Sequence, residues 1–425
     1  MIMVFTSPAR AVDLKVSGEF FAAGMYLDKT TLMKNVANEG PSTAFYYQRL
    51  RVQTDFIVSP GLSLTTRFDA MERAWGATRS TPGTVLDTQS QGTRAENENI
   101  AFDMAYVQYV SPVGIVAAGY LPESTWGTVF GNNSTSAGKI SYTLAVKNFT
   151  FIGHIVKHYD ASKTAINAAG YSDADYNGYY LMALYRFKYG VVGLANFWLD
   201  NMATRPLGYR SRIPLYLDPF VKAKIGPVAL QAELLYQQGK RAYEAPGNQD
   251  INISALAGWI DAVADFGMFY AGGTFAYVSG DNPDTTDKVE GGTLTGGNDF
   301  DPCLILWNYD RAYWVGSLSG YDATTANGAA MTNGFLYQIR AGVRPIDKLD
   351  IMGSVTYAYA DQKPSGYQGR NYGWEIDLTA KYKITNNLSY ALGLGYLFTG
   401  DFYKGTTNND LNNEYLVVNK LTLSF

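Results

Sequence analysis

The sequence predicts an all-β fold, a transmembrane antiparallel up-and-down β-barrel of about 18 strands. Three observations support this fold. Apolar and polar residues alternate along many segments, short and long connections alternate between those segments, and aromatic residues mark the ends of the apolar stripes. Charged residues make up only 17% of the chain, against ~25% in ordinary globular proteins. No run approaches the ~18 consecutive apolar residues that a membrane-spanning helix needs.

The first residues have the character of an export signal. Residues 1–5 are apolar, and Ala9-Arg10-Ala11 has the small-x-small form of a signal-peptidase site. We therefore expect residues 1–11 to be a residual signal peptide and residues 12–425 to form a single barrel domain.

The clearest strand covers residues 372–384. One face carries apolar and aromatic residues and the other carries polar ones, with Tyr372, Trp374, Ile376, Leu378, Ala380, Tyr382 and Ile384 opposite Gly373, Glu375, Asp377, Thr379, Lys381 and Lys383. Tryptophan and tyrosine at both ends of an aliphatic stripe are typical of strands that cross lipid. The same parity recurs near residues 49–56, 139–147, 228–237 and 349–359. Inside a closed barrel, the charged face surrounds a lumen.

The connections predict a regular series of hairpins. Tight turns are expected near residues 59–61, 111–113, 147–148, 188–190, 225–227, 266–267, 347–348 and 386–387. Longer polar segments alternate with them, near residues 28–41, 73–98, 122–136, 160–176, 201–211, 240–251, 281–333, 362–370 and 403–413. About nine hairpins follow. At 16–18 strands a barrel leaves an aqueous channel.

The last segment, residues 415–425, ends on Phe425 and carries apolar residues at alternate positions, although Asn419 is polar. In this respect the chain resembles the Gram-negative outer-membrane β-barrel porin superfamily. The resemblance implies the cell outer membrane as location, with short turns and both termini in the periplasm and long loops outside. It implies membrane lipid as a partner, and the barrel-insertion machinery as a partner of the Phe425 strand. The resemblance is also compatible with assembly into a homotrimer. The layout is similar to that of alginate-export-type 18-stranded barrels as well.

Charged residues on the polar parity are the candidates for pore lining and selectivity: Arg49, Arg51, Arg67, Asp55, Asp69, Arg340 and Arg344. Guanidinium groups can bind carboxylates or phosphates of a solute. The alternative is that these arginines pair with Asp55, Asp69 and one another and stiffen the wall. The sequence favours neither interpretation.

Residues 281–333 form the longest loop, and its centre is too apolar and aromatic for a solvated surface. We expect this loop to fold into or across the barrel mouth and to constrict it. Asp299, Asp301, Asp310 and Arg311 would then face the opening, with Trp307 and Trp314 in the same constriction. The alternative is a cap that packs on other external loops or on a neighbouring subunit.

Several functions have little support. His154 and His158 lie four residues apart on a strand, about 13 Å, so they cannot share a metal ion, and Cys303 is the single cysteine. We predict no metal site, no cofactor and no catalytic residues, because no nucleophile–histidine motif or phosphate-binding loop is present. A net charge of −4 gives no reason to expect a nucleic-acid partner.

The predicted function is an outer-membrane channel, a porin for passive diffusion of small hydrophilic solutes, with anionic solutes as one option. A polysaccharide-export channel is one alternative. Another is a barrel scaffold that sheathes a periplasmic multihaem cytochrome. An outer-membrane enzyme ranks last.

Overall fold

The computed structural model describes residues 12–34, 40–76, 100–123, 125–160, 174–245, 247–322 and 328–425. Eighteen strands close into one antiparallel barrel, which confirms the predicted fold. The barrel strands are β1 (Asp13–Leu27), β2 (Thr43–Ser59), β3 (Leu62–Ala74), β4 (Ala101–Ser111), β5 (Gly114–Pro122), β6 (Ser136–Val146), β7 (Phe149–Tyr159), β8 (Tyr176–Phe187), β9 (Gly190–Asn201), β10 (Tyr209–Ile225), β11 (Val228–Tyr243), β12 (Ile251–Asp265), β13 (Phe269–Val278), β15 (Gly334–Ile346), β16 (Leu349–Tyr359), β17 (Asn371–Lys383), β18 (Leu388–Thr399) and β19 (Glu414–Ser424).

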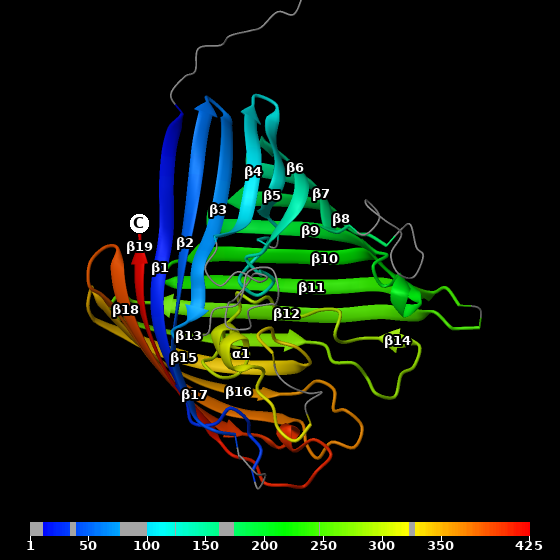
Figure 1. Cartoon of the computed structure of the whole chain (residues 1–425), viewed down its shortest axis with the longest axis vertical. Helices are drawn as coiled ribbons and strands as arrows, with labels where there is room; N and C mark the ends of the chain where they lie inside the picture. The colour runs from blue at the N-terminus through cyan, green and yellow to red at the C-terminus, as the bar shows by residue number, and fades with distance from the viewer. Residues whose placement is uncertain are drawn as a thin grey trace, which may run out of the picture.

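Consecutive strands are hydrogen-bonded neighbours around the barrel, and β13 pairs directly with β15. The short strand β14 (Lys288–Val289) lies within the connection between them and adds a parallel pair to β12. Three short helices complete the described secondary structure: α1 (Tyr309–Val315), η1 (Arg205–Leu207) and η3 (Asp401–Lys404). In Figure 1 the walls β1–β5 and β9–β13 cross steeply, as opposite sides of a tilted barrel do.

The barrel closes between its first and last strands. β1 pairs with β19 over the register from Glu19–Ser424 to Leu27–Leu416. Phe425 continues this pairing, because Gly18 and Phe425 exchange backbone hydrogen bonds of 2.8 and 3.0 Å. Closure satisfies the edge groups that an open sheet would leave unpaired.

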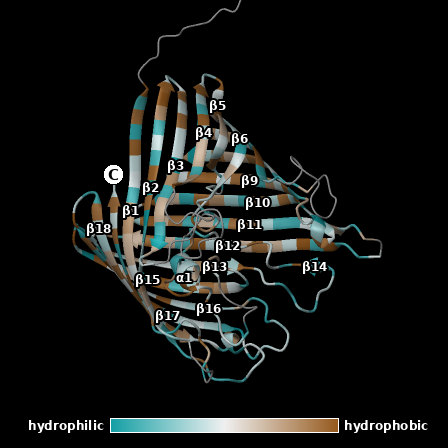
Figure 2. Ribbon diagram, in the orientation of Figure 1, coloured by the Kyte–Doolittle hydropathy of each residue, from teal (hydrophilic) through white to brown (hydrophobic). Residues whose placement is uncertain are grey.

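The predicted period of two decides which side chains point outward. On β17, Trp374, Ile376 and Leu378 are exposed, whereas Glu375 and Asp377 between them are buried. Figure 2 shows the resulting bands of hydrophobic and hydrophilic residues along the strands. An outer surface this rich in exposed apolar side chains suits hydrocarbon rather than water.

Tyr372 departs from this pattern. The alternation assigns it to the outer face, but its side chain is 1% exposed and packs inside the barrel against Trp307 and Phe402. The cause is a β-bulge, since the β16–β17 register shifts between Ala358 and Tyr359. An extra residue in one strand reverses the parity beyond it, so the prediction for Tyr372 was wrong.

The connections follow the predicted rhythm of short turns and long loops along the described chain. Among the described residues, no helix is long and apolar enough to cross a bilayer. The expected signal-peptide remnant, residues 1–11, lies outside the described residues. The largest cluster of buried apolar side chains includes residues of the connection between β13 and β15 together with residues of the barrel wall.

Candidate functional site

The connection between β13 and β15, residues 279–322 and 328–333 of the described chain, folds into the barrel; we call it the long loop. Its centre, Ile305, Leu306 and Trp307, is at most 1% exposed. Its contacts are with the side of the strands opposite to the exposed apolar face. In Figure 1, α1 of this loop lies within the outline of the barrel. Its apolar composition therefore serves packing inside the lumen.

Glu375 of β17 holds the centre of the long loop. Its two carboxylate oxygens accept hydrogen bonds from the backbone N–H groups of Ile305, at 2.6 Å, and Leu306, at 2.8 Å. Nearby, the Cys303 thiol donates to the Thr356 hydroxyl at 3.4 Å, and the Gln338 amide donates to the Pro302 carbonyl at 2.6 Å. Buried carboxylates need such donors, because desolvation without them is costly.

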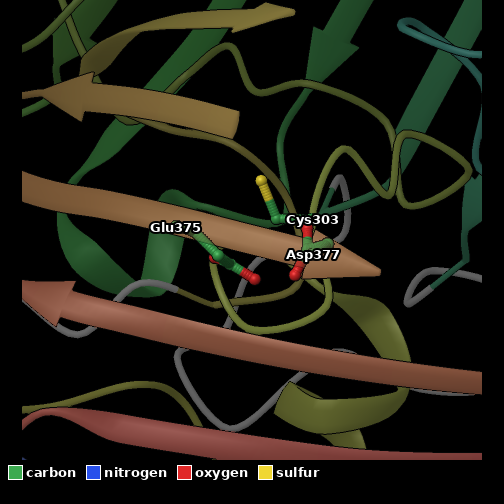
Figure 3. A group of neighbouring side chains, drawn as sticks. All are labelled: Cys303, Glu375 and Asp377. Carbon is green, nitrogen blue, oxygen red and sulfur yellow. The ribbon is translucent and has the colours of Figure 1, made fainter. Parts of the chain in front are cut away.

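Cys303, Glu375 and Asp377 bring three potential metal-ligand atoms within 4.8 Å of one another. Figure 3 shows both carboxylates on the same strand and the thiol approaching from the loop. Each group already has a protein partner: both Glu375 oxygens accept from the backbone, the Cys303 thiol donates to Thr356, and the Ser354 hydroxyl donates to Asp377 at 3.4 Å. This arrangement fits an anchor for the loop.

A second anchor joins α1 to β19. Arg311 donates to Glu414 through Nε at 3.1 Å and through Nη2 at 3.0 Å, and through Nη1 to the Gly316 carbonyl at 2.6 Å. The two charged side chains are 1% and 0% exposed. The expectation that Arg311 faces the opening is therefore wrong, because its guanidinium is turned into the wall to neutralise a buried carboxylate.

The other predicted residues of the long loop differ in their surroundings. Trp307 is buried edge-on against Tyr372, and Trp314 lies 4.8 Å from Tyr47 between ring centroids. Asp310 accepts a hydrogen bond from the Tyr47 hydroxyl at 3.0 Å.

Asp299 and Asp301 lie nearer the surface of the long loop. Asp299 accepts a hydrogen bond from Ser134 at 2.7 Å. Asp301 accepts one from the Tyr309 backbone at 2.7 Å and keeps an exposed side chain. Of the four charged residues expected at the opening, Asp301 therefore fits that role best.

A second connection also enters the barrel, and sequence reasoning missed it. The short loop, residues 123 and 125–135 between β5 and β6, is anchored by Glu233 of β11. Glu233 accepts from the backbone of Thr128 at 2.9 Å and of Gly131 at 3.3 Å, and from the Thr128 hydroxyl. Buried glutamates on the wall thus hold both loops, Glu233 the short loop and Glu375 and Glu414 the long loop. The signal in the sequence was the group of Trp126, Val129 and Phe130 within a mainly polar segment.

The two loops meet inside the barrel. The backbone N–H of Gly297 donates to the Phe130 carbonyl at 2.5 Å, and that of Asp299 donates to the Asn132 carbonyl at 3.0 Å. Phe130 also packs edge-on against Phe300, with ring centroids 5.3 Å apart. Together the loops form a hydrogen-bonded bridge anchored on β11, β17 and β19, which lie on different parts of the wall.

The predicted arginines of β2 and β3 lie on the inner wall in a cluster of ion pairs. Arg51 binds both oxygens of Asp69, at 2.7 and 2.6 Å, and Arg67 binds Asp103 with Nε at 3.0 Å. Arg49 lies 3.6 Å from Glu19 and 3.5 Å from Glu72.

Glu72 reaches this face next to a second irregularity, where Met71 has a positive φ of 54° and the β2–β3 register shifts. Asp55, the remaining predicted carboxylate of this wall, accepts from Thr65 at 2.6 Å.

Arg340 and Arg344 are paired in the same way on β15. Arg340 contacts both oxygens of Asp261, at 2.7 and 2.8 Å. Arg344 reaches Asp265 and Asp350, each at 3.0 Å, beside the short turn that follows β12. All five predicted arginines therefore have carboxylate partners, the arrangement expected if they stiffen the wall.

The two histidines line the wall of β7. His154 lies 3.5 Å from the Lys139 amine, and His158 lies 2.8 Å from the Tyr180 hydroxyl. Both imidazole rings also lie against the ring of Tyr180, at 6.1 and 6.3 Å between centroids.

No protein-family model and no curated protein matches the chain. Solved structures do. Pseudomonas aeruginosa OccK9 (OpdG) is 15% identical with a TM-score of 0.55, covering 96% of this chain and 98% of that one. Pseudomonas aeruginosa OpdK, solved with vanillate, is 14% identical at 0.54, covering 96% and 99%. Pseudomonas aeruginosa OccK2 (OpdF), in complex with glucuronate, is 12% identical at 0.54, covering 96% and 98%. At these identities the likeness shows a shared fold.

Proposed function

We propose that this chain is an outer-membrane channel for passive diffusion of small hydrophilic solutes, narrowed by the long and short loops. The observation that carries the proposal is the bridge of two loops inside an 18-stranded barrel, anchored at Glu233, Glu375 and Glu414. A barrel of this size would otherwise leave a wide aqueous bore. Inward loops convert such a bore into a size-selective path.

The proposed orientation follows from the connections. Short turns would face the periplasm together with both termini, and the long loops would face outside, as in other outer-membrane barrels. Arg344 and its two carboxylate partners lie at the end of the barrel that carries the short turns. The paired arginines of β2 and β3 would therefore lie deeper inside the channel.

A preference for anions is the finer part of the proposal. Arg51 is 26% exposed whereas Asp69 is 14% exposed, and Arg49 is 20% exposed whereas Glu72 is 8% exposed. In these two pairs the guanidinium is the more accessible member, which favours a modest anion preference beside them, whereas in the Arg49–Glu19 and Arg67–Asp103 pairs the carboxylate is the more exposed member. Carboxylate ligands in two structures of similar fold, vanillate with OpdK and glucuronate with OccK2, agree with this direction.

Planar-bilayer recordings test the proposal. The purified protein in detergent should insert alone and give steady single-channel currents. The double variant Arg49→Gln/Arg51→Gln should lower the Cl⁻/K⁺ permeability ratio, whereas Arg344→Gln beside the short turn should change it less. No conductance from folded protein would reject the channel. An unchanged ratio in the double variant would reject the role of these arginines.

The same recording separates the cytochrome-sheath alternative. A sheath needs an empty barrel, but here the two loops already occupy the interior. A sheath would also co-purify with its cytochrome, which its haem absorbance would reveal. Without that partner, the barrel of a sheath would leak.

A further inference from the structure

A cavity of about 210 Å³ lies between the inner wall and the short loop. The short loop contributes Glu123, Trp126, Gly131 and Asn133, and strands β7–β10 contribute His158, Tyr176, Tyr180, Phe197, Leu199, Tyr216 and Asp218. Most of these wall residues lie near strand ends that lead into long connections. The cavity is therefore at the mouth end of the barrel, on the proposed route of a solute.

Six aromatic rings line the cavity, and several of them pack against one another. Phe197 packs edge-on against Tyr180, at 4.7 Å between centroids, and against Tyr216, at 5.1 Å. Tyr176 stacks on His158 at 4.4 Å. The Trp126 indole N–H donates to the Asp218 carbonyl at 3.0 Å, which fixes the loop side. The cavity is thus preformed, as small-molecule sites generally are.

The polar groups of the cavity include both donors and acceptors. The hydroxyls of Tyr176 and Tyr216 have no hydrogen-bond partner within the described chain. The Tyr180 hydroxyl donates to Glu123 at 2.7 Å. The Asn133 carbonyl oxygen accepts from the backbone of Asn298 at 2.8 Å, so its NH₂ group is the part left for a ligand.

This lining discriminates between ligand classes. It contains the carboxyl groups of Glu123 and Asp218 but no lysine or arginine, which disfavours an anion. An ammonium group only donates, so it would leave the donors of Tyr176, Tyr216 and Asn133 unpaired. A sugar hydroxyl both donates and accepts, and the C–H face of a sugar ring can pack on an aromatic ring.

We propose that this cavity is a binding site for one ring of a small neutral sugar at the mouth of the channel. The inference rests on the proposed function, because an open mouth must bring solutes to the cavity. The site is separate from the arginine pairs of β2 and β3, so sugar binding and ion selectivity depend on different residues.

The test measures sugar binding and conduction separately. Saturation-transfer NMR on the full chain in detergent uses glucose, glucuronate and choline as probes, and bilayer recordings with added glucose follow transient block. We expect saturable glucose binding, weakened about tenfold in Tyr176→Phe/Tyr216→Phe, which removes two hydroxyls and keeps both rings. The matched control is Tyr179→Phe, because Tyr179 lies on the outer face of β8, the strand that carries Tyr176. This variant should bind glucose normally.

Other outcomes would overturn the site. Choline or glucuronate binding more tightly than glucose would give the wrong ligand class. Binding of none of the probes, or glucose binding that the double variant leaves intact, would make the cavity a packing feature. Steady currents without glucose binding would reject this inference alone. Glucose binding by a folded protein that does not conduct would reject the channel alone.

Discussion

Replacing Arg311 by alanine should release the long loop from the wall and widen the channel. Arg311 makes three hydrogen bonds, two to Glu414 and one to the Gly316 carbonyl. Its removal leaves the Glu414 carboxylate, 0% exposed, without a counter-charge. Breaking a buried pair from one side costs about 3–5 kcal/mol. At ~1.4 kcal/mol per factor of ten, the docked loop should lose roughly 10²-fold to 4 × 10³-fold in population relative to released states.

The assay combines single-channel conductance with limited proteolysis of the purified barrel. In Arg311→Ala we expect larger or noisier currents and cleavage within the long loop, while the barrel keeps its folded mobility in unheated SDS gels. The strands do not depend on Arg311 for their own hydrogen bonds, so loop release and barrel unfolding are separable.

The double variant Arg311→Met/Glu414→Leu is the matched control. Replacing both members of a buried ion pair by apolar residues of similar volume is often neutral or stabilising. Its conductance and protease resistance should therefore stay close to those of the parent. If Arg311→Ala behaves like the parent, or if the double variant is as open as the single one, charge burial does not hold this loop.

Three further predictions concern the same lumen. Glu375→Gln keeps one acceptor for the Ile305 and Leu306 N–H groups and loses the other. It should weaken docking of the long loop by about 1–3 kcal/mol and increase the current noise, and noise equal to that of the parent would contradict this anchor. Cys303 is 4% exposed and burial raises the pKa of its thiol, so maleimide should label it slowly in the parent and faster in Arg311→Ala; equal rates would show that the loop does not shield it. Partial desolvation by the surrounding loop and wall, with Asp310 and Asp299 nearby, raises the pKa of Asp301 to about 7. Because this side chain is also exposed to lumen water, its midpoint should lie between ~3.9 and about 7. The lumen gains one negative charge as pH rises through that range, so relative K⁺ permeability should increase from pH 4 to 8, and this increase should be smaller in Asp301→Asn.

Much of the wall could be predicted because its determinants are local. In a strand, the side-chain direction alternates with every residue, so Trp374, Glu375, Ile376 and Asp377 could be assigned to faces from the sequence alone. Turn residues between the strands gave the number of hairpins. The sequence also suggested that Asp69 could pair with arginines of this wall, since residues of the polar parity on adjacent strands face the same side.

The interior could not be predicted to the same extent, because it depends on contacts between residues far apart in sequence. Arg311 is paired with Glu414, 103 positions away. The local sequence pattern of the loop does not indicate that Arg311 pairs with a buried carboxylate of the wall. The short loop is held by Glu233, 105 positions from Thr128. Tyr372 was misplaced because a bulge depends on how two strands meet.

The sequence by itself therefore determined a closed barrel with one apolar and one polar face, since backbone alternation and turn chemistry need no distant partner. Only the tertiary structure decided which loops enter the lumen, which charges are neutralised there and where a cavity remains. Those outcomes depend on burying charge and apolar surface together, and that balance exists only once the wall has closed around the loops.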